Sequence, residues 1–432
     1  MINSKNSDQK EYDIIVVGAG LAGCSAAYYL TKGGMQTALL EMREVCSGAS
    51  GRMGGQVLEL EPATSEAAAG GKYTLSNEVI KKKNRMANDG KVLLDSLSDE
   101  LGVDVEYVKN GSVVVAFSEE EAIELKKGID RQKEAEETDI IFLNPSQMSK
   151  LYPVFGDNQY GARYSETDGN ANPFRIAYGF AYAAQKIGLK IFTYTPAKSL
   201  LFHKNKVTGV KTDKGEFHAR YGVIMATSAW NKNILPEYPI LPWKHLGFAT
   251  EQLPILPVPA TDIYYGIADG RIVDSHSQKK GSIPFRVFGG SQKDGSVIIG
   301  GDPVGLLKMD DHLTEDVHPE DFLRYGAVFN KFWVKVKNVS LIRVWAGALP
   351  FTPDGMPLVG PTRYENLYMN SGNVNGNVFC PITGKTIAEY ILNNGKTSIP
   401  IDFLNPERFA DDAFEWPEKY DYNTLADYLS KK

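Results

Sequence analysis

A glycine-rich turn near the N-terminus has the residue types and spacing that suit phosphate binding. The apolar run Asp13–Val17 is followed at once by Gly18-Ala19-Gly20-Leu21-Ala22-Gly23, and Glu41 stands eighteen residues after Gly23. Glycines at this spacing allow a tight turn, a close approach of backbone to a pyrophosphate and close helix–strand packing, while the acid can bind a ribose diol. The helix N-terminus attracts phosphate charge. The pattern therefore predicts dinucleotide binding by Gly18, Ala19, Gly20, Leu21, Ala22, Gly23 and Glu41.

A loop rich in small residues, Met42–Gln56, follows this unit directly. It offers many backbone amides and little bulk, so it could wrap the pyrophosphate and lie against a large planar ring. A flexible surface loop is the alternative that composition alone leaves open. The residues that we predict to contact a cofactor here are Met42, Arg43, Ser50, Gly51, Arg52, Met53, Gly54, Gly55 and Gln56.

The elements that must position these residues follow two patterns. Apolar strands followed by glycine turns recur near residues 12, 36, 189, 222 and 366, which predicts an α/β nucleotide-binding unit. Residues 90–150 and 240–340 instead favour an antiparallel sheet with covering helices. The uncharged run Ile14–Leu30 approaches the length of a membrane span, but its glycines predict a strand, a turn and a helix. We therefore expect no transmembrane segment.

Composition narrows the class of protein. The chain has 432 residues and a net charge of −6, so it has no general electrostatic attraction to nucleic acid. Three cysteines without a C-x-x-C pair suit a reducing compartment, and the polar N-terminus lacks a signal core. These features predict a cytoplasmic protein. His312 and His318 near Asp310 and Asp311 are better explained as a polar surface loop than as a metal site, so we expect no metal.

Several motifs together resemble the D-amino-acid oxidase (DAO) superfamily of FAD-dependent oxidoreductases, which includes glycine, sarcosine and D-amino-acid oxidoreductases. The opening turn is similar to the family's flavin-binding start, and Ser47–Gln56 to the loop of its amine-oxidising members, where Asn more often stands at Met53. The matches run in the family's order over roughly residues 12–409. The later ones are Asp168–Pro173, Thr195–Lys198, Val207–Thr212, Gly222–Trp230, Ala249–Leu253, Gly295–Gly301, Trp345–Gly347, Thr352–Pro357 and the glycines of Gly372–Gly384.

The resemblance implies a fold and a cofactor. The fold class would be α/β, with a Rossmann-like FAD-binding domain (1–88, 151–235 and 340–409) interleaved with an α+β substrate domain on a mostly antiparallel sheet (89–150 and 236–339). Residues 410–432 would form an acidic, aromatic tail that packs on this chain or docks in a homo- or hetero-oligomer. The cofactor would be FAD, with further contacts from Ala197, Thr227, Ser228, Trp230 and Gly347.

A glycine- and asparagine-rich segment precedes the last predicted helix, Thr383–Leu392, for which Thr383 is the expected N-cap. In the family this helix points its N-terminus at the flavin, where a positive helix end stabilises the negative charge of the reduced ring. An ordinary strand-to-helix loop is the alternative. The predicted contacts are Gly372, Asn373, Val374, Asn375, Gly376 and Asn377.

Departures from the family pattern refine these expectations. Neither the region of Met53 nor Val344–Phe351 offers the His or Cys that tethers flavin covalently in some members, so we predict non-covalent FAD. The strand Ser296–Ile299 lacks the lysine that assists oxygen reduction in sarcosine oxidases, so the acceptor could be oxygen or a quinone or other redox partner. Leu349 stands where amino-acid oxidases usually carry a carboxylate-binding arginine. The predicted substrate residues are Gln56, Arg286, Trp345, Leu349 and Asn375.

The leading hypothesis is oxidation of the C–N bond of a small amine or amino-acid-like substrate to an imine, with hydride transfer to flavin N5 and no certain catalytic side chain. Flavin-dependent oxidation of a 2-hydroxy acid or polyol is one alternative. A non-catalytic flavoprotein subunit of a larger complex is the other.

Overall fold

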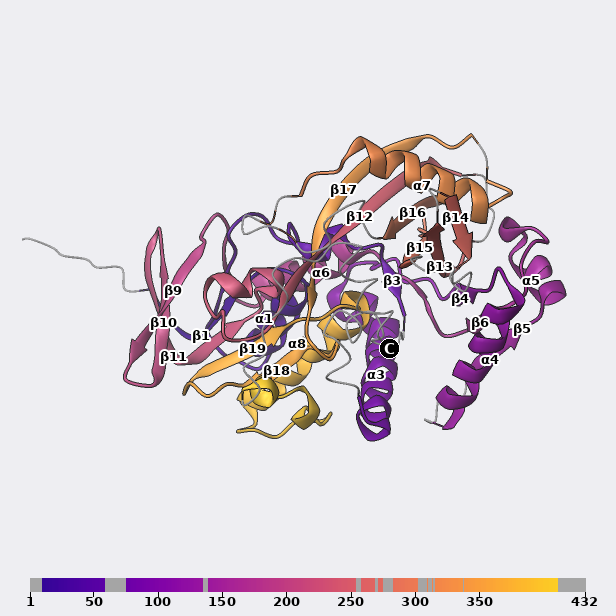
Figure 1. Ribbon diagram of the computed structural model, residues 1–432. Coiled ribbons are helices and arrows are strands. Elements are labelled where there is room, and N and C mark those ends of the chain that lie inside the picture. The colour runs from indigo at the N-terminus through magenta and orange to yellow at the C-terminus, as the bar shows by residue number, and fades with distance from the viewer. Residues whose placement is uncertain are drawn as a thin grey trace, which may run out of the picture.

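The computed structural model describes residues 10–58, 75–134, 139–253, 258–268, 271–274, 283–301, 309, 313, 315–336 and 338–410. Its strands form two large sheets, which occupy the left and the upper right of Figure 1. The predicted aromatic tail lies outside the described residues, apart from Ala410.

The first sheet is built around β1 (Lys10–Val17), which pairs in parallel with β2 and β11. Ile14–Val17 are buried because elements cover both faces of this part of the sheet. The strand order is β18-β19-β11-β1-β2-β8, with a β9–β10 hairpin continuing from β11. The other strands are β2 (Thr37–Leu40), β8 (Lys190–Phe192), β9 (Ala197–His203), β10 (Lys206–Thr212), β11 (Gly215–Met225), β18 (Leu358–Pro361) and β19 (Leu367–Ser371).

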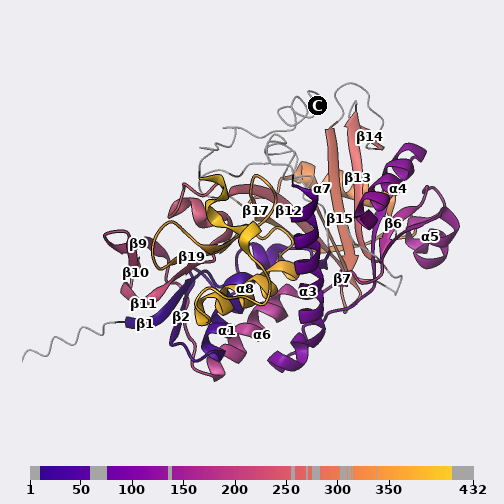
Figure 2. The same ribbon diagram turned by 90° about the horizontal axis from the view of Figure 1, so that it is seen from below.

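Four helices pack together against this sheet, as Figure 2 shows from below. They are α1 (Leu21–Lys32), α3 (Asn77–Leu101), α6 (Pro173–Lys186) and α8 (Gly376–Leu392). Helices α1 and α8 approach closely: a Cβ on Gly384 would lie 2.1 Å from Ser25 Oγ. The glycine thus sets the distance between the two helices that carry the predicted cofactor motifs.

The last helix begins earlier than the sequence predicts. α8 starts at Gly376, Pro381 lies inside it, and the hydroxyl of Thr383 donates to the carbonyl of Phe379 at 2.8 Å. Thr383 as N-cap is therefore wrong. The carbonyl of Asn375 already accepts from the amides of Val378 and Phe379, so a turn forms upstream of the proline. Pro381 has no backbone N–H, so the helix lacks one backbone donor at this position. Ser25 of α1 donates to the Pro381 carbonyl at 2.8 Å and so fastens this turn of α8 to α1.

The second sheet is mostly antiparallel, in the order β17-β12-β16-β15-β13-β4-β6-β5, with β14 on β13. Its strands are β4 (Ser112–Val115), β5 (Ile140–Leu143), β6 (Ala162–Ser165), β12 (Leu241–Gln252), β13 (Ala260–Ala268), β14 (Arg271–Asp274), β15 (Ile283–Ser291), β16 (Ser296–Gly301) and β17 (Leu341–Phe351). Its helices are α4 (Glu119–Glu134), α5 (Pro145–Leu151) and α7 (Pro319–Phe332). A third, two-stranded sheet joins β3 (Gln56–Val57) to β7 (Gly169–Asn170). The mixed α/β class with an antiparallel second layer is confirmed.

The predicted domain ranges remain a division proposed from sequence, and the strand pairing qualifies them at three places. β6 and β17 fall in ranges assigned to the cofactor domain but pair within the second sheet. Helix α3, whose second half (89–101) falls in the range assigned to the substrate domain, packs into the core of the first sheet. Buried polar contacts connect α3 to the second sheet here. Lys91 Nζ of α3 lies 2.8 Å from Asp168 Oδ1, and Ser112 Oγ of β4 donates to Asp168 Oδ2 at 2.5 Å.

Candidate cofactor and active site

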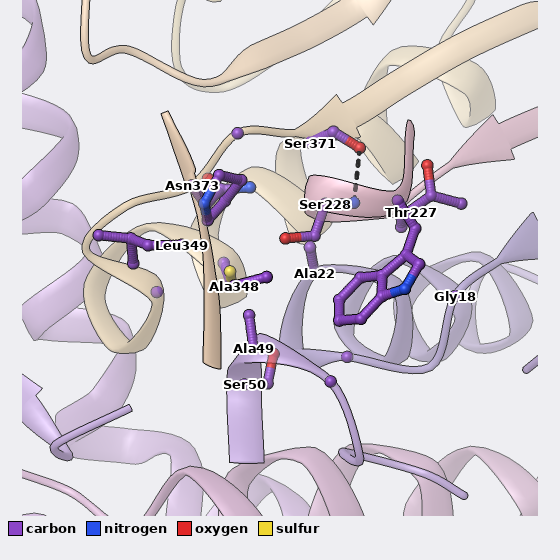
Figure 3. A pocket seen from close by; sticks show the side chains of 18 of the residues that line it. Gly18, Ala22, Ala49, Ser50, Thr227, Ser228, Ala348, Leu349, Ser371 and Asn373 are labelled. Carbon is purple, nitrogen blue, oxygen red and sulfur yellow. Dashed lines mark hydrogen bonds between the residues drawn. The ribbon is translucent and has the colours of Figure 1, made fainter. Parts of the chain in front are cut away.

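A long cavity opens at the carboxyl ends of the parallel strands, where β1, β2, β11 and β19 lead into Gly18, Glu41, Ala226 and Gly372. Ligands of doubly wound sheets bind at this edge. The second sheet supplies the opposite wall through β12, β15 and β17. In Figure 3, Asn373, Leu349 and Ala348 lie on one side of the cavity and Ser228, Thr227 and Gly18 on the other.

Two of the three glycines of the first turn, Gly18 and Gly23, occupy places where a side chain would overlap backbone atoms. Gly18 has a φ of +102°, and a Cβ there would lie 2.4 Å from the carbonyl of Ala226. A Cβ on Gly23 would lie 1.8 Å from the carbonyl of Gly18. Gly20 faces Ser50, whose Oγ accepts from the amide of Leu21 at 3.0 Å. The turn therefore presents bare backbone and the uncapped N-terminus of α1 to the cavity.

Glu41 lies at the end of β2 and is 8% exposed. Its two carboxylate oxygens accept from the backbone amides of Ala19 and Arg43, each at 2.8 Å. The acid thus ties the glycine turn to the following loop while it lines the cavity. This double attachment holds the carboxylate in one orientation.

The loop after Glu41 is anchored by its own side chains. Arg52 donates to the carbonyl of Ser47 and pairs with Glu315, with 2.6 Å between NH2 and Oε2. Burial lowers the pKa of the Arg52 guanidinium, and Glu315 opposes that shift. Trp345 Nε1 donates to the Arg52 carbonyl at 2.8 Å, and a Cβ on Gly347 would lie 2.8 Å from Arg52 Cβ. The loop is therefore an ordered wall, not the flexible alternative.

The far end of the cavity is formed by β19 and α8. Gly372 has a φ of +83°, and α8 starts at Gly376 without a side-chain cap. Asn370 is fully buried and lines the cavity, and its Oδ1 accepts from Asn373 Nδ2 at 3.2 Å. Its Nδ2 has no hydrogen-bond partner in the described part of the chain. An unpaired buried donor costs about 1–3 kcal/mol, so it fits a site that a polar group completes.

The remaining polar contacts on this side come from short backbone turns. Ser371 Oγ accepts from the amide of Ser228 at 3.3 Å, the bond drawn in Figure 3, and donates to the Met225 carbonyl at 3.0 Å. Together with the glycine cradle, the uncapped helix ends and Glu41, these groups fit a long cofactor with a pyrophosphate, a ribose and a flat ring. FAD has these parts.

Most of the predicted residues line this cavity. The predicted lining residues are Gly18, Gly20, Ala22, Glu41, Met42, Ser50, Arg52, Met53, Gly54, Gln56, Ala197, Thr227, Ser228, Trp230, Gly347, Leu349, Gly372, Asn373, Val374, Asn375 and Gly376.

Other predicted residues do not line the cavity themselves. Those outside the lining are Ala19, Leu21, Gly23, Arg43, Gly51, Gly55, Trp345 and Asn377. Asn377, for example, donates from Nδ2 to the carbonyls of Gly55 and Ala171 at 2.8 and 3.0 Å. Arg286 lies in β15 opposite Tyr264, but its side chain is outside the described part of the structure.

Sequence reasoning missed several lining residues, including His245, Phe288, Asn370 and Thr195. His245 and Phe288 come from β12 and β15, and their rings lie 5.8 Å apart. No local motif marks them, since only strand pairing brings them to the cavity. A polar residue two positions before Gly372 was the one available signal for Asn370.

The cysteines near the cavity are buried, and burial disfavours the charged thiolate form. Burial raises the pKa of Cys380, which lines the cavity, to about 12, and does the same for Cys46. The described residues contain no group of three or more His, Cys, Asp or Glu side chains that could hold a metal ion. None of their helices is both long enough and apolar enough to cross a bilayer.

Comparisons with known proteins agree with this geometry. The chain is 26% identical over 404 residues to glycine oxidase of Bacillus subtilis, covering 89% of this chain and 94% of that protein. It is 25% identical to sarcosine oxidase subunit beta of Arthrobacter, covering 93% and 92%. Its fold is similar to the crystal structure of L-proline dehydrogenase from P. horikoshii, with a TM-score of 0.74, 24% identity, and coverage of 93% and 99%. The model of the DAO family, described as FAD dependent oxidoreductase, matches residues 13–390. The chain therefore belongs to the DAO family of FAD-dependent oxidoreductases.

Proposed function

We propose that this protein oxidises the C–N bond of a small amine or amino-acid-like substrate to an imine. The observation that carries the proposal is the two-walled cavity: backbone of the first sheet and its loops forms the cofactor side, and β12, β15 and β17 cover the other. The names of the similar proteins, glycine oxidase and sarcosine oxidase, support this class of substrate. Bound FAD would supply a hydride acceptor for the substrate carbon.

The chain's own residues would bind and orient the substrate. Gln56 Nε2 donates to the carbonyls of Thr261 and Gly289, both at 3.2 Å, so its amide is held between the loop and the second sheet. Phe288 and Leu349 add apolar surface to the same wall. Such a wall excludes water and fixes the reacting carbon near the ring, which is the main protein contribution when the cofactor carries the chemistry.

The cofactor end would stabilise the charge that reduction creates. The N-terminus of α8 and the amides of the Gly372–Gly376 turn present donors to the cavity. Asn370 Nδ2 adds a buried donor from the adjoining strand end. We propose that FAD is held non-covalently, that the acceptor in normal use is not oxygen, and that the protein is cytoplasmic.

The decisive experiment is anaerobic reduction of the flavin by a panel of glycine, sarcosine, N,N-dimethylglycine, L-proline, larger amines and 2-hydroxy acids. Bleaching of the yellow colour by amines with release of the imine hydrolysis product supports C–N oxidation. Bleaching by hydroxy acids alone would replace it by alcohol oxidation, and bleaching by no compound would favour a non-catalytic subunit.

A further inference from the structure

The side-chain amide of Gln56 spans from the cofactor loop to the second sheet in a fixed orientation. Gln56 lies on the short strand β3, is half-buried and lines the cavity. Its Nε2 donates to the carbonyls of Thr261 on β13 and Gly289 on β15, both at 3.2 Å. These two residues stand directly opposite each other in the β13–β15 pair. An amide nitrogen carries two hydrogens, and the two carbonyls account for both.

The backbone that carries this side chain is held by two further amides. Gln292 Nε2 donates to the carbonyl of Gly54 at 3.3 Å, and Asn377 Nδ2 donates to that of Gly55 at 2.8 Å. Gly55 has a φ of +80°, and a Cβ there would lie 2.9 Å from the carbonyl of Ala171. The amide group of Gln56 is therefore fixed from its backbone as well as from its nitrogen.

This orientation decides which polar atom Gln56 can offer to a ligand. Two carbonyl neighbours assign the nitrogen to the side of the sheet, so the oxygen, Oε1, remains for the cavity. Within the described part of the chain, no donor reaches Oε1, and it is not one of the buried unpaired oxygens. An amide oxygen accepts hydrogen bonds and cannot donate one. Gln56 thus presents an acceptor on a wall to which Phe288 and Leu349 add apolar surface.

We propose that Gln56 Oε1 accepts a hydrogen bond from the N–H of the substrate amine, so that the site favours primary and secondary amines over tertiary ones. The inference rests on the proposed function, since it assigns a partner to the reacting nitrogen. A neutral tertiary amine has no N–H and would leave this acceptor without a partner in a site that excludes water.

The same contact would assist the reaction itself. When the substrate carbon gives up a hydride to the cofactor, the nitrogen lone pair forms the C=N bond and the nitrogen becomes positively charged. The N–H proton stays on nitrogen in this step and becomes a stronger donor. A hydrogen bond with a charged partner is stronger than a neutral one, so the bond to Oε1 strengthens as the transition state is approached.

The first test uses the holoenzyme and two flat ligands that cannot be oxidised, pyrrole-2-carboxylate and furan-2-carboxylate. They have the same carboxylate and differ in a ring N–H against a ring oxygen, so the ratio of their Kd values reports on an acceptor in the cavity. Binding is followed by the change in flavin absorbance. The wild type should bind the pyrrole roughly 3- to 10-fold more tightly. Equal Kd values for the two ligands would overturn the proposal without the need for any variant.

Two variants make the result specific. Gln56→Met keeps the length of the side chain and removes the amide, so the two Kd values should come within about 2-fold of each other. Gln292→Met is the matched control, because it removes the donor to Gly54 but no acceptor from the cavity, and it should keep the wild-type ratio. A Gln56→Met protein that keeps the wild-type ratio would overturn the proposal.

Kinetics extend the test to turnover. Gln56→Met should lower kcat/KM for the best secondary amine of the panel by roughly 10- to 100-fold and lower that for its N-methyl derivative much less. An equal loss for both amines would mean that Gln56 only supports the loop, which would contradict the proposal. If no amine reduces the flavin but the preference for pyrrole still depends on Gln56, the proposed function fails and the acceptor stands. If amines reduce the flavin and the preference is missing, the acceptor fails and the proposed function stands.

Discussion

Removal of the Glu41 carboxylate should weaken FAD binding and loosen the turn that receives it. The carboxylate has two roles in the structure. It lines the cavity, and it accepts two hydrogen bonds of 2.8 Å from the backbone amides of Ala19 and Arg43. Ala19 is fully buried, and deletion of the carboxylate removes the protein acceptor of its amide. Glu41→Ala therefore perturbs both the free protein and the complex.

The magnitude follows from the contacts. A hydrogen bond to a charged group contributes about 1.5–3 kcal/mol. Loss of one ribose contact then raises the Kd for FAD by roughly 10- to 150-fold. The stranded amide of Ala19 adds a cost of about 1–3 kcal/mol to the stability of the apoprotein. Glu41→Gln retains one acceptor oxygen, so it should fall between the alanine variant and wild type in both quantities.

The assay is titration of apoprotein with FAD, followed by quenching of flavin fluorescence, together with the thermal unfolding midpoint of each apoprotein. Glu44→Ala, an exposed acid three residues along, is the control and should leave the Kd unchanged. A Glu41→Ala protein that binds FAD with wild-type affinity would refute the reasoning. A lower midpoint with unchanged affinity would mean that the acid only supports the turn.

The remaining predictions concern the cofactor, its reoxidation, the substrate and the glycine turn. All flavin should be released to the supernatant on acid precipitation, since Met53 stands in the first loop without a tethering histidine; colour retained in the pellet would falsify non-covalent binding. In stopped flow, the reduced enzyme should react with air more slowly than with a quinone. The reason is that the strand segment Val297–Ile299, beside the loop at Gly54, offers no cation that would favour oxygen reduction. Fast reoxidation by air would contradict this. Glycine and common D-amino acids should be turned over poorly compared with bulkier or less polar amines, because Leu349 cannot pair with a carboxylate, and efficient steady-state turnover of glycine would count against that explanation. Gly23→Ala should abolish FAD binding or folding, because its Cβ would overlap the Gly18 carbonyl. Gly326→Ala, in open space on α7, is the control and should raise the free energy of unfolding by about 1 kcal/mol. Equal thermal midpoints for the two variants would disprove the packing argument.

The local motifs of this chain could be interpreted from sequence because each depends on neighbours a few residues away. The turn Gly18–Gly23 needs bare backbone for its own conformation, and the acid at Glu41 follows from one strand–helix–strand unit. The buried parallel strands at Ile14–Val17 and Val223–Met225 were visible as apolar runs for the same reason. Family membership rests on these motifs occurring in order.

The start of α8 and the second wall of the cavity could not be predicted in this way. The upstream turn at Asn375 extends α8 past Pro381, and the contact with Ser25 comes from a helix more than 350 residues away in sequence. His245, Phe288 and Asn370 reach the cavity only because distant strands pair and twist into one surface. Residue types along the chain determined that a dinucleotide could bind. Long-range strand pairing decided which side chains face the cavity, because the register between strands depends on the packing of the whole core.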